Sequence, residues 1–253
     1  MFQKIKIIHI NQTTSTQDSI MDYLKYDYYS SLLLIAKTQS KGRGRKQNDW
    51  YSPEGGFWAT LGASTSSLSK SQLALFHFFT ATLIRFVIEN EYNLKTQIKW
   101  PNDILYENKK LAGILIDYIV SSQVNYILIG IGVNLNNSSK KMPEGLSSKS
   151  VSIKDVLKKP VSIDKFAKKI CFYANKYYSP ITENNLMVIK TLIQEYNEHS
   201  QIFGKEVILD DSKKYLCQGI NHKGYMRFEQ KNMKRNLTID DVTRIRTIIH
   251  RRT

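Results

Sequence analysis

The chain has 253 residues, of which 42% are hydrophobic and 23% are charged. This composition is that of a globular protein, so collagen-like and intrinsically disordered chains are excluded. No uninterrupted apolar run approaches the ~18 residues that a membrane span needs, and we expect no membrane partner. Only two cysteines occur, Cys171 and Cys217, and they form no Cys-x-x-Cys pair. This argues against a disulfide framework or a thiolate zinc site and favours a reducing, cytoplasmic location.

Lysine and arginine number 37 against 22 aspartates and glutamates, which gives a net charge of +15. A basic excess of this size makes nucleic acid a candidate partner. The excess is spread along the chain, however, and such a spread is more typical of a solvated surface. The densest basic run, residues 41–46, interleaves glycine with arginine. Glycines let a backbone wrap an anion that arginines then neutralise.

Hydrophobic periodicity predicts a mixture of strands and helices over the first 203 residues. Helices are expected near 162–178, near 184–199 and from a cap at Ser69 or Ser71 to about Asn90. Strand 125–135 carries glycines on one face and is a candidate edge for pairing with a second chain. The other expected strands lie at the N-terminus and at 32–38, 57–63, 97–100, 103–106 and 111–118.

From Gly204 onward the pattern changes to short strands separated by glycine turns. They are expected at 205–210, 214–221, 224–230 and 243–249. Short strands of this kind are typical of a small barrel. We therefore expect two domains, residues 1–203 and residues 204–253.

Several common catalytic motifs are absent from the sequence. Gln47 stands where a dinucleotide-binding fingerprint needs its third glycine, and Gly224 is followed by Tyr-Met instead of the Lys-Ser/Thr of a P-loop. There is no Gly-x-Ser-x-Gly elbow and no His-Glu-x-x-His helix, and the five histidines never stand at ligand spacing. The familiar nucleophile, zinc and P-loop sites are thereby excluded.

Three segments place charged side chains beside glycines or within apolar strands. Residues 42–46 lie in a long polar loop and are followed by Trp50. They suit either a clamp on phosphates or a carboxylate, with Trp50 covering a flat ring, or a flexible basic loop. Residues 99–103, Lys-Trp-Pro-Asn-Asp, place charged groups between apolar strands, which indicates either a site or a simple Asx turn. Lys110 leads a strand in which Gly113 permits a close approach by an anion.

In this order and spacing the three segments closely resemble those of biotin protein ligases. Ser15-Thr16-Gln17 resembles the family's Ser-Thr-Asn element, Gln39 its glutamine before the loop, and residues 130–135 its later glycine-asparagine strand. The resemblance runs from about Thr14 to Asn136 and more loosely through the C-terminal barrel. It implies an α+β fold with a mixed-sheet biotin/lipoate ligase catalytic domain, related to class II aminoacyl-tRNA synthetases, and an SH3-like β-barrel.

The resemblance also implies an ATP-dependent ligase that joins biotin to a lysine of a biotin carboxyl carrier domain. Biotin's carboxylate attacks the α-phosphate of ATP and pyrophosphate leaves. The carrier lysine then attacks the biotinyl-5′-adenylate and expels AMP. Lys110 would bridge the carboxylate and the α-phosphate. Arg43 and Arg45 would close over the adenylate, and Mg²⁺ would take the pyrophosphate. Asp103 would hold the attacking group or the metal.

The resemblance implies two overlapping groups of site residues, and the chain departs from the family pattern in two segments. Gln17 stands in place of asparagine, and Gln47-Asn48 stands in place of the glycine-arginine that commonly continues the loop. The implied biotin contacts are Ser15, Thr16, Gln17, Gln39, Arg43 and Gly113, and the implied ATP or adenylate contacts are Arg43, Gly44, Arg45, Trp50, Asn102, Lys110 and Asn134.

Only 13 residues precede Thr14, so we expect no N-terminal helix-turn-helix and no DNA binding. An acidic carrier domain is then a sufficient partner for the basic surface. Monomer and homodimer both stay open. The alternatives are a lipoate–protein ligase on the same fold and, from a different class, a basic nucleic-acid-binding protein. An octanoyltransferase is disfavoured because neither cysteine lies near the matched segments.

Overall fold

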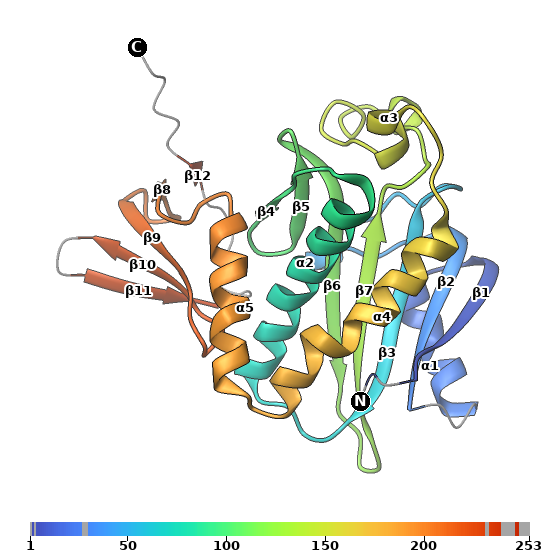
Figure 1. Ribbon diagram of the computed structural model, residues 1–253, viewed down its shortest axis with the longest axis horizontal. Helices are drawn as coiled ribbons and strands as arrows, with labels where there is room; N and C mark the ends of the chain where they lie inside the picture. Colours follow the sequence, from blue (N-terminus) through green and yellow to red (C-terminus); the bar gives the residue numbers. More distant parts are fainter. Residues whose placement is uncertain (1, 3, 27–29, 231–232, 239–245, 248–253) are drawn as a thin grey trace.

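A computed structural model describes residues 2, 4–26, 30–230, 233–238 and 246–247. Within them the chain builds a seven-stranded sheet flanked by helices and, beside it, a five-stranded sheet made from the C-terminal residues (Figure 1). The α+β class expected from the sequence is confirmed. The large sheet carries the candidate site, and α5 joins it to the small sheet.

The large sheet is mixed, with the strand order β1-β2-β3-β7-β6-β5-β4. Only β1 and β2 pair in parallel, and the remaining neighbours are antiparallel. Its strands are β1 (Lys6–Thr13), β2 (Ser31–Gln39), β3 (Phe57–Thr65), β4 (Gln97–Lys99), β5 (Asp103–Tyr106), β6 (Lys109–Ile119) and β7 (Asn125–Val133).

Strand β7 is internal, because β3 pairs along one side of it and β6 along the other. The expectation that 125–135 offers an edge for a second chain is therefore wrong. The physical reason is that the rest of the sheet supplies a partner strand on each side, which the strand's own alternation does not specify. Ile127, Ile129 and Ile131 face one buried layer, while Gly130 and Gly132 let side chains approach closely on the opposite face.

The β5–β6 hairpin is tighter than the sequence suggests. Its turn consists of Glu107 and Asn108, both with positive φ (47° and 62°), which is the backbone of a two-residue hairpin turn. Strand β6 consequently begins at Lys109, so Lys110 lies within the strand and opposite Leu105 on β5. This register brings the Lys110 side chain to the neighbouring strand.

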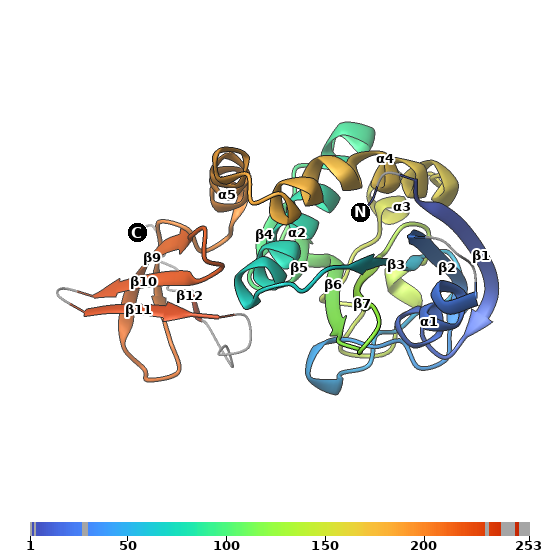
Figure 2. The ribbon, with the colours of Figure 1, turned by 90° about the horizontal axis from the view of Figure 1, so that it is seen from below.

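Helices cover both faces of the large sheet (Figure 2). On one face lie α2 (Lys70–Tyr92) and α4 (Ile163–Thr182), followed by α5 (Leu186–His199). On the other lies α1 (Thr16–Tyr26), which the sequence analysis missed because its apolar stripe is narrow: Ile20 and Leu24 are its buried core residues. The short α3 (Ile153–Leu157) was missed as well.

Helix α2 begins as predicted, since Ser69 caps it and forms a capping box with Gln72. By length and composition α2 is the one helix among the described residues that could cross a membrane. Most of its apolar side chains are instead buried against the sheet and the neighbouring helices, with Phe76, Phe79 and Leu83 completely covered. It is the central core helix of this domain.

The small sheet has the order β11-β10-β9-β8-β12 and is antiparallel. This is consistent with an SH3-like domain. Asn197 on α5 anchors it, donating to the carbonyl of Ile220 at 3.3 Å and accepting from the Ile220 amide at 2.8 Å. The domain boundary at residue 203 stays a prediction. The strands are β8 (Glu206–Ile208), β9 (Lys214–Ile220), β10 (Met226–Gln230), β11 (Met233–Leu237), which was not predicted, and β12 (Arg246–Thr247). Much of the strand expected at 243–249 lies outside the described residues.

Burial on α2 lowers the pKa of His77 to about 4. Because the unfolded chain takes up this proton near pH 6.5 and the folded chain does not, stability is fully present above that pH and falls as the pH drops through the folded pKa. We expect the free energy of unfolding to lose about 3 kcal/mol between pH 7 and pH 4 through this group. Urea denaturation of His77→Gln should show that part of the pH dependence missing. An unchanged profile in the variant would contradict this assignment.

Candidate active site

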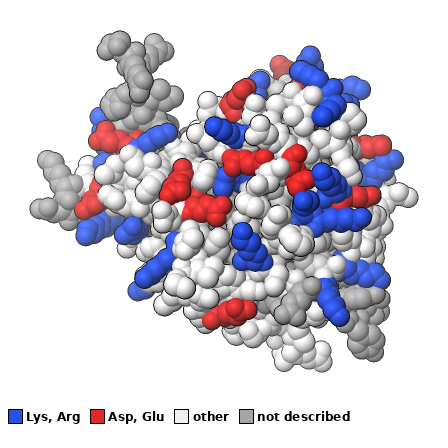
Figure 3. Space-filling model, in the orientation of Figure 1, with Lys and Arg blue, Asp and Glu red and all other residues white. Residues whose placement is uncertain are grey.

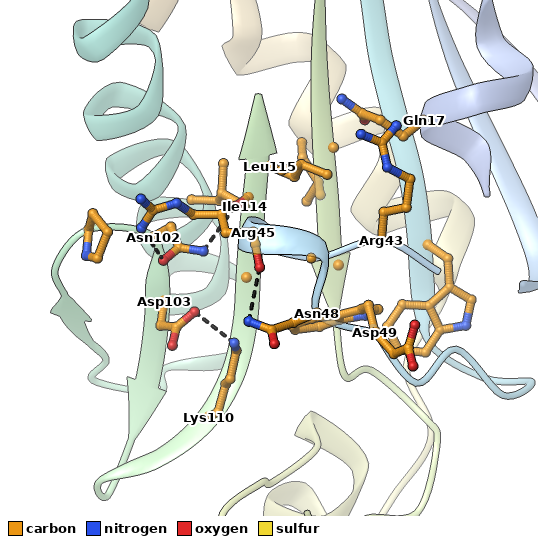
Figure 4. A pocket seen from close by; sticks show the side chains of 18 of the residues that line it. Gln17, Arg43, Arg45, Asn48, Asp49, Asn102, Asp103, Lys110, Ile114 and Leu115 are labelled. Carbon is orange, nitrogen blue, oxygen red and sulfur yellow. Dashed lines mark hydrogen bonds and ion pairs between the residues drawn. The ribbon is translucent and has the colours of Figure 1, made fainter. Parts of the chain in front are cut away.

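A cavity of about 540 Å³ opens over the glycine-bearing face of strands β6 and β7. Its walls come from the start of α1, the polar loop after β2, the turn between β4 and β5, and the segment that follows α5. Every predicted site residue except Asn134 lines it, and Figure 4 shows several of them facing one another. These residues are Ser15, Thr16, Gln17, Gln39, Arg43, Gly44, Arg45, Trp50, Asn102, Asp103, Lys110 and Gly113.

The start of α1 forms a hydrogen-bonding wall of this cavity. The side-chain oxygen of Gln39 accepts hydrogen bonds from the backbone amide and the hydroxyl of Thr16, at 2.7 and 3.1 Å. The side-chain nitrogen of Gln39 donates to Ser52 Oγ at 2.8 Å. Both ends of this amide are therefore engaged, which fixes its orientation and ties α1 to the loop after β2.

Gln17 is buried in the same wall, with 4% of its surface exposed. Its amide donates to the Leu128 carbonyl at 3.2 Å, and its oxygen accepts from Thr60 Oγ1 at 3.1 Å. The longer side chain has room because Gly130 stands opposite: a Cβ there would lie 2.7 Å from Gln17 Oε1. Gln17, which replaces the family's asparagine, thus fits between α1 and the sheet.

The indole of Trp50 lies against the glycines of β6 and β7. Gly113 and Gly132 pair across the two strands, and a Cβ on them would come within 2.7 and 2.6 Å of the indole. Lys110 Nζ lies 4.7 Å from the ring centroid, within the range of a cation–π contact. Trp50 Nε1 is buried and has no hydrogen-bond partner among the described residues. The indole therefore forms part of the cavity wall above the two glycines.

Lys110 and Asp103 form an ion pair inside the cavity, with 2.8 Å between Nζ and Oδ1. The lysine side chain is 34% exposed and the aspartate 19%. Asp103 stands on β5 and Lys110 on β6, so the hairpin itself brings them together. The pair holds one ammonium group in a defined position at the cavity wall, where it can meet an anionic ligand.

The glycine-arginine loop is folded over the cavity. Arg45 opens a short 3₁₀ turn (Arg45–Gln47) and lies 3.5 Å from Asn102 Oδ1. The Asn48 side chain donates to the Arg45 carbonyl at 2.9 Å, and the Gly44 amide donates to the Asn48 carbonyl at 2.7 Å. Gln47 holds a left-handed conformation, with φ of 60°, where glycine is favoured. With Gln47 and Asn48 in place of the family's residues, the loop thus forms a short turn closed by hydrogen bonds.

Asn134 lies outside the cavity lining. It is 4% exposed, and its side chain donates to the Lys110 carbonyl at 3.4 Å and accepts from Asn137 at 2.9 Å. In this conformation the Asn134 side chain is bonded to the backbone at the start of β6. Its contact with adenine stays a prediction.

Sequence reasoning missed several lining residues. Thr60 on β3 gives no signal, because a threonine in a strand is ordinary. Lys99 lies in the Lys-Trp-Pro-Asn-Asp segment, but the sequence predicts no role for it. Gln201 and Ile202 reach the cavity from the segment after α5, where nothing in the sequence indicates a site. Neither Cys171 nor Cys217 is among the residues that line the cavity.

No cluster of three or more His, Cys, Asp or Glu side chains suited to a metal occurs in the described part of the chain. Asp103 and Asp49 are the carboxylates that line the cavity. Magnesium usually binds one or two carboxylates together with substrate phosphates and keeps several waters. This donor set fits a metal that arrives with a nucleotide.

Comparisons with known proteins agree with this geometry. The Biotin/lipoate A/B protein ligase family model matches residues 9–134. The bifunctional ligase/repressor BirA of Bacillus spizizenii is 30% identical over 194 residues, covering 75% of this chain and 59% of that protein. The biotin–protein ligase of Homo sapiens is 25% identical, covering 89% of this chain and 32% of that protein. The chain thus spans about three fifths or less of these relatives.

A solved structure of the biotin protein ligase from Aquifex aeolicus superposes with a TM-score of 0.75 at 20% identity, covering 96% of this chain and 99% of that one. The fold is therefore that of biotin protein ligase structures. Residues 9–134 therefore form a domain of the biotin/lipoate A/B protein ligase family.

Proposed function

We propose that the protein is a biotin protein ligase that activates biotin with ATP and transfers it to a lysine of a biotin carboxyl carrier domain. One observation carries the proposal: a single cavity joins a neutral hydrogen-bonding wall to a cationic one. Gln17 lies at one side, and Lys110, Asp103 and Arg45 lie at the other (Figure 4). Biotin has the matching layout, with a polar ureido ring at one end and a carboxylate at the other.

The first step joins a carboxylate to the α-phosphate of ATP, so two anions must be brought together. Lys110, held by Asp103, would neutralise the carboxylate and the α-phosphate as they meet, and Arg45 would lie over the adenylate. The carboxylate oxygen attacks phosphorus, and the bond to pyrophosphate breaks. In the second step the carrier lysine amine attacks the acyl carbon and AMP leaves. The mixed anhydride supplies the activation in this step.

Mg²⁺, bound through the ATP phosphates, would supply charge neutralisation for the leaving pyrophosphate. Asp103 and Asp49 are the side chains placed to hold it or its waters. Asp103 is already paired with Lys110, so its positioning of that lysine does not depend on the metal.

The named complexes of the structural relatives support this assignment. The Aquifex aeolicus enzyme was solved with biotin and ATP and the Leishmania major enzyme with biotinyl-5-AMP. Both share the fold of this chain at 20% and 19% identity, and their ligands are those that the proposed reaction requires. We further propose a cytoplasmic enzyme that has an acidic carrier domain as its partner and does not bind DNA. Basic and acidic side chains are interspersed on the face in Figure 3, which lacks a continuous basic stripe.

The direct test is transfer to a purified carrier domain in the presence of ATP and magnesium. We expect the carrier to gain one biotinyl group on its acceptor lysine, as measured by intact-protein mass spectrometry. A carrier whose acceptor lysine is replaced by arginine is the matched control and should stay unmodified. Attachment of lipoate in place of biotin would overturn the choice of substrate, and no attachment of either would overturn the proposal.

A further inference from the structure

The Arg43 guanidinium lies between two carboxylates that come from different elements. One of its terminal nitrogens contacts Asp18 in the first turn of α1, and the other lies 3.2 Å from Asp117 on β6. The three side chains are 44%, 51% and 31% exposed, so the cluster lies at the outer rim of the cavity. Neither carboxylate belongs to a motif on which the family resemblance rests.

This cluster ties the glycine-arginine loop to the two elements that frame the cavity. Asp18 follows directly on the wall formed by residues 15–17, and Asp117 follows residues 113–115 on the same strand as Lys110. The Arg43 backbone pairs with that of Asp49, so the position of the Arg43 side chain is coupled to that of the loop from Gly42 to Trp50. One arginine therefore fastens the loop at both sides of the opening.

We infer that Asp18 and Asp117 are positioning residues, which bind Arg43 from two sides and hold the loop closed over the adenylate. The cluster of these three side chains is called the clasp below. This inference rests on the function proposed above. With its two nitrogens engaged by protein carboxylates, Arg43 has its charge offset, and neutralisation of the phosphate falls to Lys110 and Arg45. The clasp then governs how long the adenylate is retained and has little effect on its formation.

The exposure of the cluster sets the size and the character of the effect. An exposed ion pair contributes little singly and is screened by salt, so the clasp opens readily for substrate entry and product release. Because two carboxylates share one guanidinium, losing either leaves the other in place. We expect each single variant to change adenylate release by no more than about threefold and the double variant by about tenfold.

The experiment compares wild type with Asp18→Asn, Asp117→Asn and the double variant, and uses Asp22→Asn as the matched control. Asp22 is exposed and lies on the same helix one turn further on. Enzyme carrying preformed adenylate is freed of substrates by gel filtration, and loss of the adenylate is followed with time. We expect faster release from the double variant and pyrophosphate–ATP exchange within about twofold of wild type. Salt should accelerate release from wild type and from Asp22→Asn but not from the double variant. Wild-type release from the double variant would overturn the inference.

A second measurement needs no catalysis. The loop carries trypsin sites at Lys41, Arg43, Arg45 and Lys46, so limited trypsin digestion without ligands reports its opening. We expect the loop of the double variant to be cut about tenfold faster than that of wild type and of Asp22→Asn. Equal cleavage would refute the clasp even in an active ligase. Faster cleavage in a protein that forms no adenylate would keep the clasp and refute the proposed function instead.

Discussion

Replacing Lys110 by alanine is expected to lower biotin adenylation by about 10²- to 10³-fold while the protein stays folded. The variant removes the ammonium group that Asp103 holds 2.8 Å away at the cavity wall. Nothing else in the hairpin then offsets the repulsion between biotin's carboxylate and the α-phosphate. Pyrophosphate–ATP exchange measures the loss, and a thermal melt checks the fold.

Two further variants separate charge from packing. Lys109→Ala removes the adjacent lysine, which is exposed and lies outside the cavity lining, and should leave exchange within about twofold of wild type. Lys110→Met keeps most of the aliphatic stem against Trp50 and should fail like alanine, because the charge is what matters. Wild-type turnover in either Lys110 variant would remove this residue from the mechanism.

Replacing Arg45 by glycine is expected to release the adenylate into solution and to biotinylate bystander lysines. The change removes the guanidinium that lies beside Asn102 and adds a flexible residue next to Gly44. The loop then no longer covers a reactive mixed anhydride. Incubation with a mixture of carrier and an unrelated protein, followed by a streptavidin blot, measures the loss of selectivity, which we expect to reach about tenfold or more.

Gln47→Gly is the matched control for this change. Position 47 has a φ of 60°, so glycine relieves strain there while Arg45 stays in place. Its labelling should remain confined to the carrier. If Arg45→Gly also labels only the carrier, loop closure does not retain the adenylate.

The fold was predictable from the sequence wherever one periodicity dominates. Strands β2 and β3 are short apolar runs bounded by polar turns, and Ser69 marks the start of α2. Helix α1 was missed because two buried core residues, Ile20 and Leu24, are too few to establish a helical period. The misplaced edge at β7 has a different cause: the pairing of a strand on both sides is a property of the whole sheet, which local alternation does not encode.

The candidate site was predictable through its motifs and not through its geometry. Motif resemblance named the residues of the loop and of the β5–β6 hairpin, and the fold brings these together in one cavity. Thr60 and Gln201 were missed because they reach the cavity through strand pairing and through the junction after α5. The engagement of Arg43 by Asp18 and Asp117 depends on two elements far apart in the sequence, so no local pattern indicates it.

The central claim is that this cavity activates biotin with ATP, and pyrophosphate–ATP exchange tests it most directly. Purified protein, magnesium and labelled pyrophosphate are incubated with biotin, with lipoate or with no acid. The account predicts label entering ATP only when biotin is present, and its loss in Lys110→Ala. Exchange supported by lipoate and not by biotin would contradict the substrate. No exchange with either acid would contradict the claim itself and make nucleic-acid binding the next hypothesis for the +15 charge.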